Sequence, residues 1–274
     1  MMELLLILLA PLIGGLIYGL ERVVKARMQN RIGPPLLQPF YDMFKFFLKE
    51  SFFVNRLHIV LGLGHFITLW VVIGYIIMGG SLLYAIFLHL LSSIFIILAG
   101  FSVRSVYSHI GANRELLSML AYEPIFIFMA VAFYLQNGSF EIDTIRASQP
   151  QILSLGLIMI AFLLTIPLKL KKSPFDMSEA HQEIVGGVEI EYSGLFYEII
   201  YTAKWLEYVF VYLLLILFAG NSWLLALILF VVVFIAINLV DNATARLKVA
   251  DMIKINLIGG IGLCVVNILG LAIL

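Results

Sequence analysis

Eight long apolar stretches recur along this chain of 274 residues, and they constrain its fold more than any other feature. A helix needs about 20 mostly apolar residues to cross the hydrocarbon core of a bilayer. The stretches cover residues 3–20, 59–79, 82–101, 116–136, 152–170, 193–219, 222–240 and 255–274. We therefore predict an all-α membrane protein with eight transmembrane helices, folded as a single integral membrane domain over residues 1–274.

The composition excludes a soluble globule. Hydrophobic residues make up 62% of the chain and charged residues only 12%, about half the charged fraction of a soluble domain. The formal net charge is zero, which gives no electrostatic basis for binding nucleic acid. The single cysteine, Cys264, excludes a disulfide framework, a thiolate zinc site and a cysteine-ligated iron–sulfur cluster within the chain.

Lysines and arginines gather in alternate connections. Nearly all 17 of them fall in or beside residues 21–58, 102–115, 171–192 and 241–254, with Arg146 and Lys204 as the exceptions. Positive charge marks the cytoplasmic side of a membrane protein, so we expect these odd-numbered connections in the cytoplasm and both termini outside the plasma (inner) membrane. No basic leader precedes the first stretch, which we therefore expect to be a spanning helix and not a cleaved signal.

The first long connection contains a short amphipathic segment. Residues 36–50 read LLQPFYDMFKFFLKE, and Gln38, Asp42, Lys45 and Lys49 share one helical face. At 15 residues the segment is too short to span, so we predict an amphipathic helix lying in the cytoplasmic interface. It is either a lipid-facing anchor or a docking helix beneath a peripheral subunit.

The connection 171–192 is an acidic cytoplasmic loop with many apolar residues and a Gly186–Gly187 break. Its acidic residues are Asp176, Glu179, Glu183, Glu189 and Glu191. Glu179 and Glu183 are four residues apart, so on one helix they would form a like-charge pair, and burial would raise one of their pKa values. The loop is either a proton store or relay, or an acidic patch that pairs with the basic first loop.

Away from the ends of the predicted spans, the acidic and lysine side chains are Glu123, Glu198, Lys204 and Glu207. Such residues are costly in a membrane and usually face the bundle interior or a water-filled path. Lys204 and Glu207 are three apart and are predicted to pair, whereas Glu123 and Glu198 lack a local partner, which favours a functional role.

No residue pattern points to chemistry within the chain. The five histidines are scattered, lack metal-ligand spacing, and are interpreted as packing or hydrogen-bonding groups. We find no catalytic residue and no metal or cofactor motif, so any redox chemistry is expected in partner subunits.

Four motifs resemble a known family. They are Glu21-Arg22 with Ala26–Pro34 and Leu37-Gln38-Pro39; Tyr107-Ser108 with Gly111-Ala112, Arg114 and Tyr122-Glu123; Pro174-Phe175-Asp176 with Glu179, Glu183, Gly187 and Glu191–Gly194; and Ala245–Lys248. Their order and spacing resemble the membrane subunit at the heel of respiratory complex I and its relatives in membrane-bound nickel–iron hydrogenases.

Within that family the sequence is mixed, and the hydrogenase branch is favoured. Quinone-reducing members carry a glycine-rich insert where only Pro35 and Leu36 stand here, and a glutamate where this chain has Lys204. The Arg114-Glu115 and Glu123-Pro124 pairs also resemble the hydrogenase branch, whereas Pro174-Phe175-Asp176 and Glu191-Tyr192 resemble the quinone branch.

The resemblance implies an anchoring and energy-coupling subunit of an ion-pumping oxidoreductase, a hydrogenase or a related sulfur-reducing complex. It implies a peripheral hydrogenase-like large subunit, iron–sulfur subunits, possible nickel–iron chemistry in those partners, and antiporter-like membrane subunits in the bilayer. The implied residues that dock the redox arm are Arg27, Gln29, Arg31, Gln38, Asp42 and Lys45. The implied acidic path comprises Glu115, Glu123, Asp176, Glu179, Glu183, Glu191 and Glu198.

Three other functions stay open. The chain could be the quinone-binding subunit of an NADH- or deazaflavin-dependent dehydrogenase, although the missing insert argues against this. A secondary transporter would typically show an internal repeat, which the two halves lack. A passive anchor would use its acidic residues only to hold subunits together.

Overall fold

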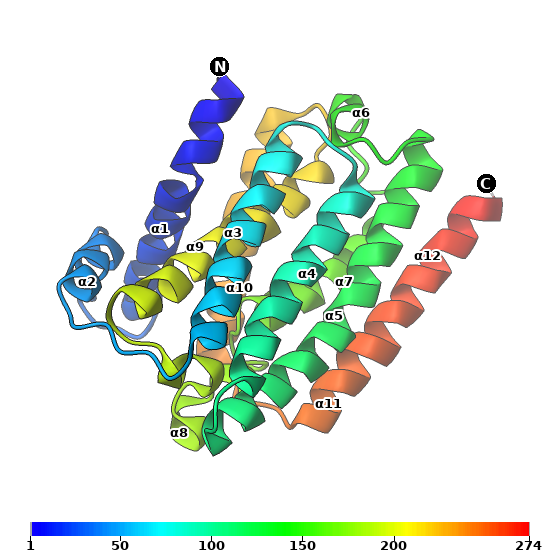
Figure 1. Ribbon diagram of the computed structural model, residues 1–274. Coiled ribbons are helices and arrows are strands. Elements are labelled where there is room, and N and C mark those ends of the chain that lie inside the picture. Colours follow the sequence, from blue (N-terminus) through cyan, green and yellow to red (C-terminus); the bar gives the residue numbers. More distant parts are fainter. Residues whose placement is uncertain (1, 274) are drawn as a thin grey trace.

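The computed structural model describes residues 2–273, and every long secondary-structure element in this range is a helix (Figure 1). The α-helices are α1 (Met2–Met28), α2 (Gln38–Phe47), α3 (Arg56–Ile77), α4 (Leu82–Phe101), α5 (Val106–Asn137), α6 (Ile142–Ala147), α7 (Gly156–Lys169), α8 (His181–Ile184), α9 (Gly194–Leu217), α10 (Trp223–Ala243), α11 (Val249–Ile253) and α12 (Ile261–Ile273). Two 3₁₀ turns, η1 (Met177–Glu179) and η2 (Gly187–Glu191), flank α8, and a π-helical segment, η3 (Lys254–Gly260), joins α11 to α12.

The prediction of an all-α membrane protein is confirmed, whereas the count of eight spans is not. Seven helices of the described chain are long and apolar enough to cross a membrane, with α11, η3 and α12 forming the last. The remaining predicted span, 152–170, is represented by α7, which has only 14 residues. At 1.5 Å per residue its length is about 21 Å, short of a bilayer core of about 30 Å.

The long helices run side by side and alternate in direction. The N-terminal end of α1 and the C-terminal end of α12 lie at one end of the bundle, together with α6, whereas α2 and α8 lie at the opposite end (Figure 1). The connections that carry most lysines and arginines therefore share one end of the bundle, as the alternation in the sequence predicts.

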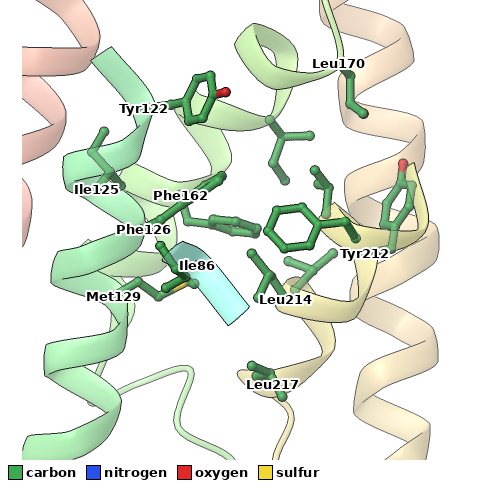
Figure 2. Close-up of a cluster of buried hydrophobic side chains, with 14 of the residues drawn as sticks. Ile86, Tyr122, Ile125, Phe126, Met129, Phe162, Leu170, Tyr212, Leu214 and Leu217 are labelled. Carbon is green, nitrogen blue, oxygen red and sulfur yellow. The ribbon is translucent and has the colours of Figure 1, made fainter. Parts of the chain in front are cut away.

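Large apolar side chains from α4, α5, α7 and α9 form the centre of the bundle. Phe126, Phe162 and Leu214 meet there with Ile86 and Met129 (Figure 2), and all five are fully buried. These side chains pack together at the density typical of protein interiors. They separate the charged end of the bundle, described below, from the end that carries α6.

Small residues let α1 approach α9 closely. A Cβ added at Gly14 would lie 2.3 Å from the carbonyl oxygen of Trp205 on α9, and one added at Gly15 would lie 2.9 Å from the ring of the same tryptophan. Glycine is therefore required at these two positions by close approach, which is typical of helix packing in membranes.

The short helix α2 falls within the predicted segment 36–50 and is fastened to the bundle on one side. Phe40 packs on Trp205 with ring centroids 5.2 Å apart, and Phe46 packs on Tyr197 at 4.8 Å. Arg22 of α1 donates to Asp42 at 2.9 Å. The opposite face exposes apolar side chains, notably those of Tyr41, Phe44 and Phe47. This arrangement suits a membrane interface.

The acidic loop folds into η1, α8 and η2, which corrects one prediction. Glu179 ends η1, and α8 begins only at His181, so Glu179 and Glu183 do not share a helix or form a like-charge pair. The chain reverses through positive φ angles at Val185, Gly186 and Gly187. A Cβ at Gly111 of α5 would lie 2.6 Å from Cα of Gly187, so the paired glycines bring the loop directly onto α5.

Candidate functional site: a line of buried charges

A cavity of about 170 Å³ lies between the acidic loop and the helices α5, α7 and α9. Charged side chains that line it are Glu115, Lys169, Lys171, Lys172, Glu179, Glu189, Lys204 and Glu207. Tyr18 and Tyr208 supply aromatic walls. Ionisable groups around a shared hollow inside a membrane protein are typical of an ion or proton path.

Two lysines tie the acidic loop to the helices around this cavity. Lys204 of α9 lies 2.9 Å from Oε2 of Glu179 and 2.7 Å from Oε2 of Glu189. Lys171 lies 2.8 Å from Glu179 and 3.5 Å from Glu115. Carboxylates and ammonium groups thus alternate from η2 through η1 to α5.

The predicted intramembrane pair of Lys204 and Glu207 is wrong. The two residues lie three apart on α9, but Lys204 turns toward the loop carboxylates, and Glu207 is bound by Lys169 at 2.8 Å. Each side chain has found a partner on another element. Sequence spacing shows which residues of one helix can meet, but it does not show competing charges contributed by α7 and the loop.

The line of charges continues inward from Glu207. Nε2 of His89 lies 3.5 Å from Oε2 of Glu207, and Nδ1 of His89 lies 3.0 Å from Oε1 of Glu123. Lys169 also donates to the hydroxyl of Tyr122 at 3.3 Å. Glu123 therefore has a partner after all, supplied by α4.

Charge neighbours set the protonation of the loop residues. Burial would raise the pKa of Glu179, but Lys171 and Lys204 hold it well below its usual range. Burial and the nearby Glu179 carboxylate raise the pKa of Glu189 to about 7. Burial alone would lower the pKa of Lys171, yet Glu115 and Glu179 raise it. The two glutamates share Lys204 and titrate as a pair.

Asp176 and Glu183 form a separate cluster nearer the surface. Arg246 donates to Asp176 through Nε at 2.8 Å and through Nη2 at 2.7 Å, and through Nη1 to Glu183 at 3.0 Å. Arg114 reaches Glu183 at 2.7 Å. Hydrogen bonds from Arg114 and Arg246 lower the pKa of Glu183. This cluster fixes η1 and α8 to the connection between α10 and α11.

Two further residues of the implied acidic path lie apart from the cavity. Glu198 is buried on α9, where Oε1 accepts from the hydroxyl of Thr202 at 2.6 Å and Oε2 has no hydrogen-bond partner among the described residues. Glu191 is half-buried at the end of η2. The structure therefore joins Glu115 to Glu179 through Lys171, and Glu123 to Glu207 through His89. Glu115, Glu179 and Glu207 line the same cavity, whereas Glu198 and Glu191 lie outside it.

The implied docking residues divide into two groups. Arg27, Gln29, Arg31 and Lys45 are exposed, at the end of the bundle that carries α2 and α8. Gln38 and Asp42 are half-buried and bonded to one another at 2.8 Å, and Asp42 also accepts from Arg22. This second pair holds α2 in place, which is a structural role that spacing alone did not indicate.

Sequence reasoning missed several members of the network, chiefly His89, Lys169, Lys171 and the role of Glu189. His89 was interpreted as a packing or hydrogen-bonding group, and it does hydrogen-bond Glu123. Its position inside the apolar stretch 82–101 could also have marked it as an intramembrane ionisable residue. Glu21, which pairs with Lys172, was also missed. Among residues 2–273 no cluster of three or more histidine, cysteine or acidic side chains could hold a metal ion.

The chain has several helices long and apolar enough to cross a membrane, with charged side chains buried between them. It is therefore a polytopic membrane protein with a charged interior. Comparison with known proteins identifies the family within this class. A family model described as NADH dehydrogenase matches residues 2–272. The chain belongs to this family, and is a membrane subunit of the complex I type.

Individual relatives agree. The chain is 31% identical over 228 residues to an NADH-quinone oxidoreductase subunit of Vesicomyosocius okutanii, a match that covers 74% of this chain and 64% of that protein. It is 32% identical over 271 residues to a putative NADH-ubiquinone oxidoreductase of Methanocaldococcus jannaschii, covering 93% and 91%. The match therefore spans less than two thirds of the Vesicomyosocius protein, but nearly all of the Methanocaldococcus protein.

A solved structure shares the fold. A chain of the membrane-bound sulfane sulfur reductase, an archaeal respiratory membrane complex, superposes with a TM-score of 0.90 and 23% identity, and 98% of each chain is covered. The helical arrangement is thus that of a chain from a respiratory membrane complex.

Proposed function

We propose that this chain anchors and couples an ion-pumping, complex-I-like oxidoreductase of the hydrogenase or sulfur-reducing type. A peripheral redox arm would dock on the end that carries α2 and α8, and antiporter-like subunits would lie beside the bundle in the membrane. Family membership supports the class of complex. The observation that carries the coupling role is the line of buried charges from Glu179 to Glu123.

The line of charges suits long-range coupling for an electrostatic reason. Glu189 and Glu179 both bind Lys204, so a change in the charge of one carboxylate is felt by the other. A charge change on a docked redox centre would alter this pair, because interactions are strong where water is scarce. Lys171 and Glu115 would pass the change toward α5, and Lys169 and Glu207 toward α4.

The cavity favours ions and water over an apolar ring. Its volume of about 170 Å³ is below the range of about 300–1,000 Å³ that is typical of ligand pockets. Lys204 occupies the wall where the resemblance places a glutamate in quinone reducers. The hydrogenase or sulfur-reducing branch is therefore the better fit.

Quinone binding remains the second candidate, because the curated relatives are named as quinone oxidoreductases. Saturable displacement of a labelled quinone analogue from the purified complex, weakened by Tyr18→Ala, would establish it. Absence of displaceable binding would leave the first candidate alone.

The coupling role is tested with Glu123→Gln in the intact complex, purified through a tag on this chain and placed in liposomes. We expect electron transfer through the peripheral arm to change less than twofold, while the number of ions moved per electron falls at least tenfold. Glu141→Gln is the matched control, since Glu141 is exposed at the opposite end of the bundle. Normal pumping by the Glu123 variant would overturn the acidic path.

A further inference from the structure

His89 of α4 occupies an unusual position among the buried groups of the bundle. Its ring is 0% exposed, and both ring nitrogens face carboxylates from different helices. Nδ1 lies 3.0 Å from Oε1 of Glu123 on α5, and Nε2 lies 3.5 Å from Oε2 of Glu207 on α9. A histidine placed in this way can exchange protons at both nitrogens.

Aromatic packing fixes the orientation of this ring. Phe210 lies parallel to it, with an interplanar angle of 3° and ring centroids 4.1 Å apart, and Phe126 packs at an angle of 60° with centroids 5.9 Å apart. The plane of the imidazole is therefore set by its neighbours, and both nitrogens stay aimed at the two glutamates. Preorganisation of this kind is what proton transfer between fixed groups requires.

The charges around the ring leave room for one additional proton. The ionisable groups that face it are Glu123 and Tyr122 on α5, Glu207 on α9, Lys169 on α7 and, behind Glu207, His65 on α3. Two carboxylates and one ammonium group carry a net negative charge, and an uncompensated charge is costly inside a membrane. A shared proton neutralises the cluster.

Three atoms in the cluster are free to receive that proton. Nε2 of His89, Oε2 of Glu123 and Oε2 of Glu207 are buried and have no hydrogen-bond partner among the described residues. Lys169 binds the other oxygen of Glu207, Oε1, at 2.8 Å. The Glu207 oxygen nearest to His89 is thus available, while the lysine keeps the carboxylate in place.

The cluster also joins two environments. Glu207 and Lys169 line the cavity that contains the loop carboxylates. Glu123 binds the other ring nitrogen, and it lies on α5, the helix that carries Phe126 and Met129 of the apolar region (Figure 2). A proton that passes from the cavity to Glu123 along the line of charges meets His89 between them.

We propose that His89 is the proton relay between Glu207 and Glu123, an inference that rests on the proposed coupling function. The proton on Oε2 of Glu207 moves to Nε2 of His89, and the proton on Nδ1 moves to Oε1 of Glu123. Glu207 is then a carboxylate, Glu123 is a carboxylic acid, and the ring carries its hydrogen on Nε2. The reverse transfer restores the first arrangement, so the cluster has two states that differ in which glutamate is protonated.

The test uses the intact complex in liposomes, with electron transfer and ion uptake measured on the same preparation. His89→Gln keeps an amide donor and acceptor in the same place, but cannot take up a proton and release another. We expect it to assemble, to retain electron transfer within twofold, and to lower the ions moved per electron at least tenfold. His109→Gln is the matched control, because within residues 2–273 the ring of His109 hydrogen-bonds only to the carbonyl oxygen of Val103, at 2.6 Å.

Two companion variants separate the possible failures. If Glu123→Gln loses pumping but His89→Gln pumps within twofold of the unmodified complex, the relay is overturned and the acidic path stands. If Glu123→Gln itself pumps normally, the proposed function fails together with the relay. If His89→Gln does not assemble, Glu207→Gln is tested in its place, because the glutamine retains an acceptor for Lys169. Loss of pumping by this variant supports the relay, and normal pumping overturns it.

Discussion

Lys204 is the side chain on which the loop carboxylates converge. It binds Glu179 and Glu189 together, although its own side chain is 24% exposed. Removing one partner from a buried ion pair typically costs about 3–5 kcal/mol, because the remaining charge stays without compensation. Partial exposure lowers that cost, since water can screen the remaining charges.

We predict that Lys204→Met lowers the free energy of unfolding by about 2 kcal/mol, which is below the range for a fully buried pair. Thermal unfolding in detergent would measure the change, with Lys248→Met as an exposed control. The double variant Lys204→Met with Glu189→Leu should recover part of the loss, because the uncompensated carboxylate is gone. Equal melting temperatures for Lys204→Met and the unmodified protein would contradict a stabilising role for the ion pairs of Lys204.

Glu189 makes stability depend on pH in a defined direction. Burial raises the pKa of Glu189 from 4.5 to about 7, so the folded protein holds this proton more tightly than the unfolded chain does. The stabilisation is complete below pH 4.5 and is lost as the pH rises toward about 7. The lowered pKa of Glu179 affects stability only around and below pH 4.5, where the unfolded chain takes up a proton that the folded carboxylate does not.

Glu189→Gln should therefore flatten the fall in melting temperature between about pH 5 and pH 7. Melting curves of the two proteins at half-unit intervals would show this. A slope unchanged by the substitution would mean that another group carries the dependence.

The apolar pattern of the sequence predicts most helix boundaries, but not all of them. The apolar stretches predicted the positions of the long helices to within a few residues at most ends, because each must bury about 20 residues in lipid. They did not predict that α5 extends from Val106 through its polar first turns, or that the fifth stretch would yield only 14 helical residues. Those features depend on tertiary contacts with the acidic loop.

Close packing of α1 against α9 gives a prediction for Gly14. Gly14→Val would push a side chain against the carbonyl oxygen of Trp205, where even a Cβ would approach to 2.3 Å. Overpacking typically costs about 1–3 kcal/mol, and we expect about 3 kcal/mol here because backbone must move. Gly262→Val is the control, since no atom lies within 4 Å of a Cβ at Gly262. Similar melting temperatures for the two variants would contradict the close approach.

The site could be predicted from sequence in part. The intramembrane glutamates and the acidic loop were identified because charges are rare in apolar surroundings. Their partners could not be, since Lys204 and Glu207 lie on one helix but bind charges from other elements. The role of His89 depends on its contacts with α5 and α9, and a single sequence does not show that those helices lie beside it.

The exposed basic residues at the end with α2 and α8 lead to a prediction about assembly. Arg27 and Arg31 are exposed, so their replacement should leave the fold intact. We predict that Arg27→Ala with Arg31→Ala reduces the peripheral redox subunits recovered with this chain at least fivefold at moderate salt. Arg104→Ala, at an exposed arginine of the same end, is the control. Unchanged recovery would argue against docking through this surface.

Purification through a tag on this chain in mild detergent, with subunit and metal analysis, tests the central claim most directly. We predict that the chain is recovered in a stable complex with peripheral subunits that contain iron. Nickel together with iron would assign the complex to the hydrogenase type, and iron without nickel to a sulfur- or quinone-reducing type. A well-folded chain recovered alone, without partners or metal, would contradict the proposal that it is a subunit of a coupled oxidoreductase.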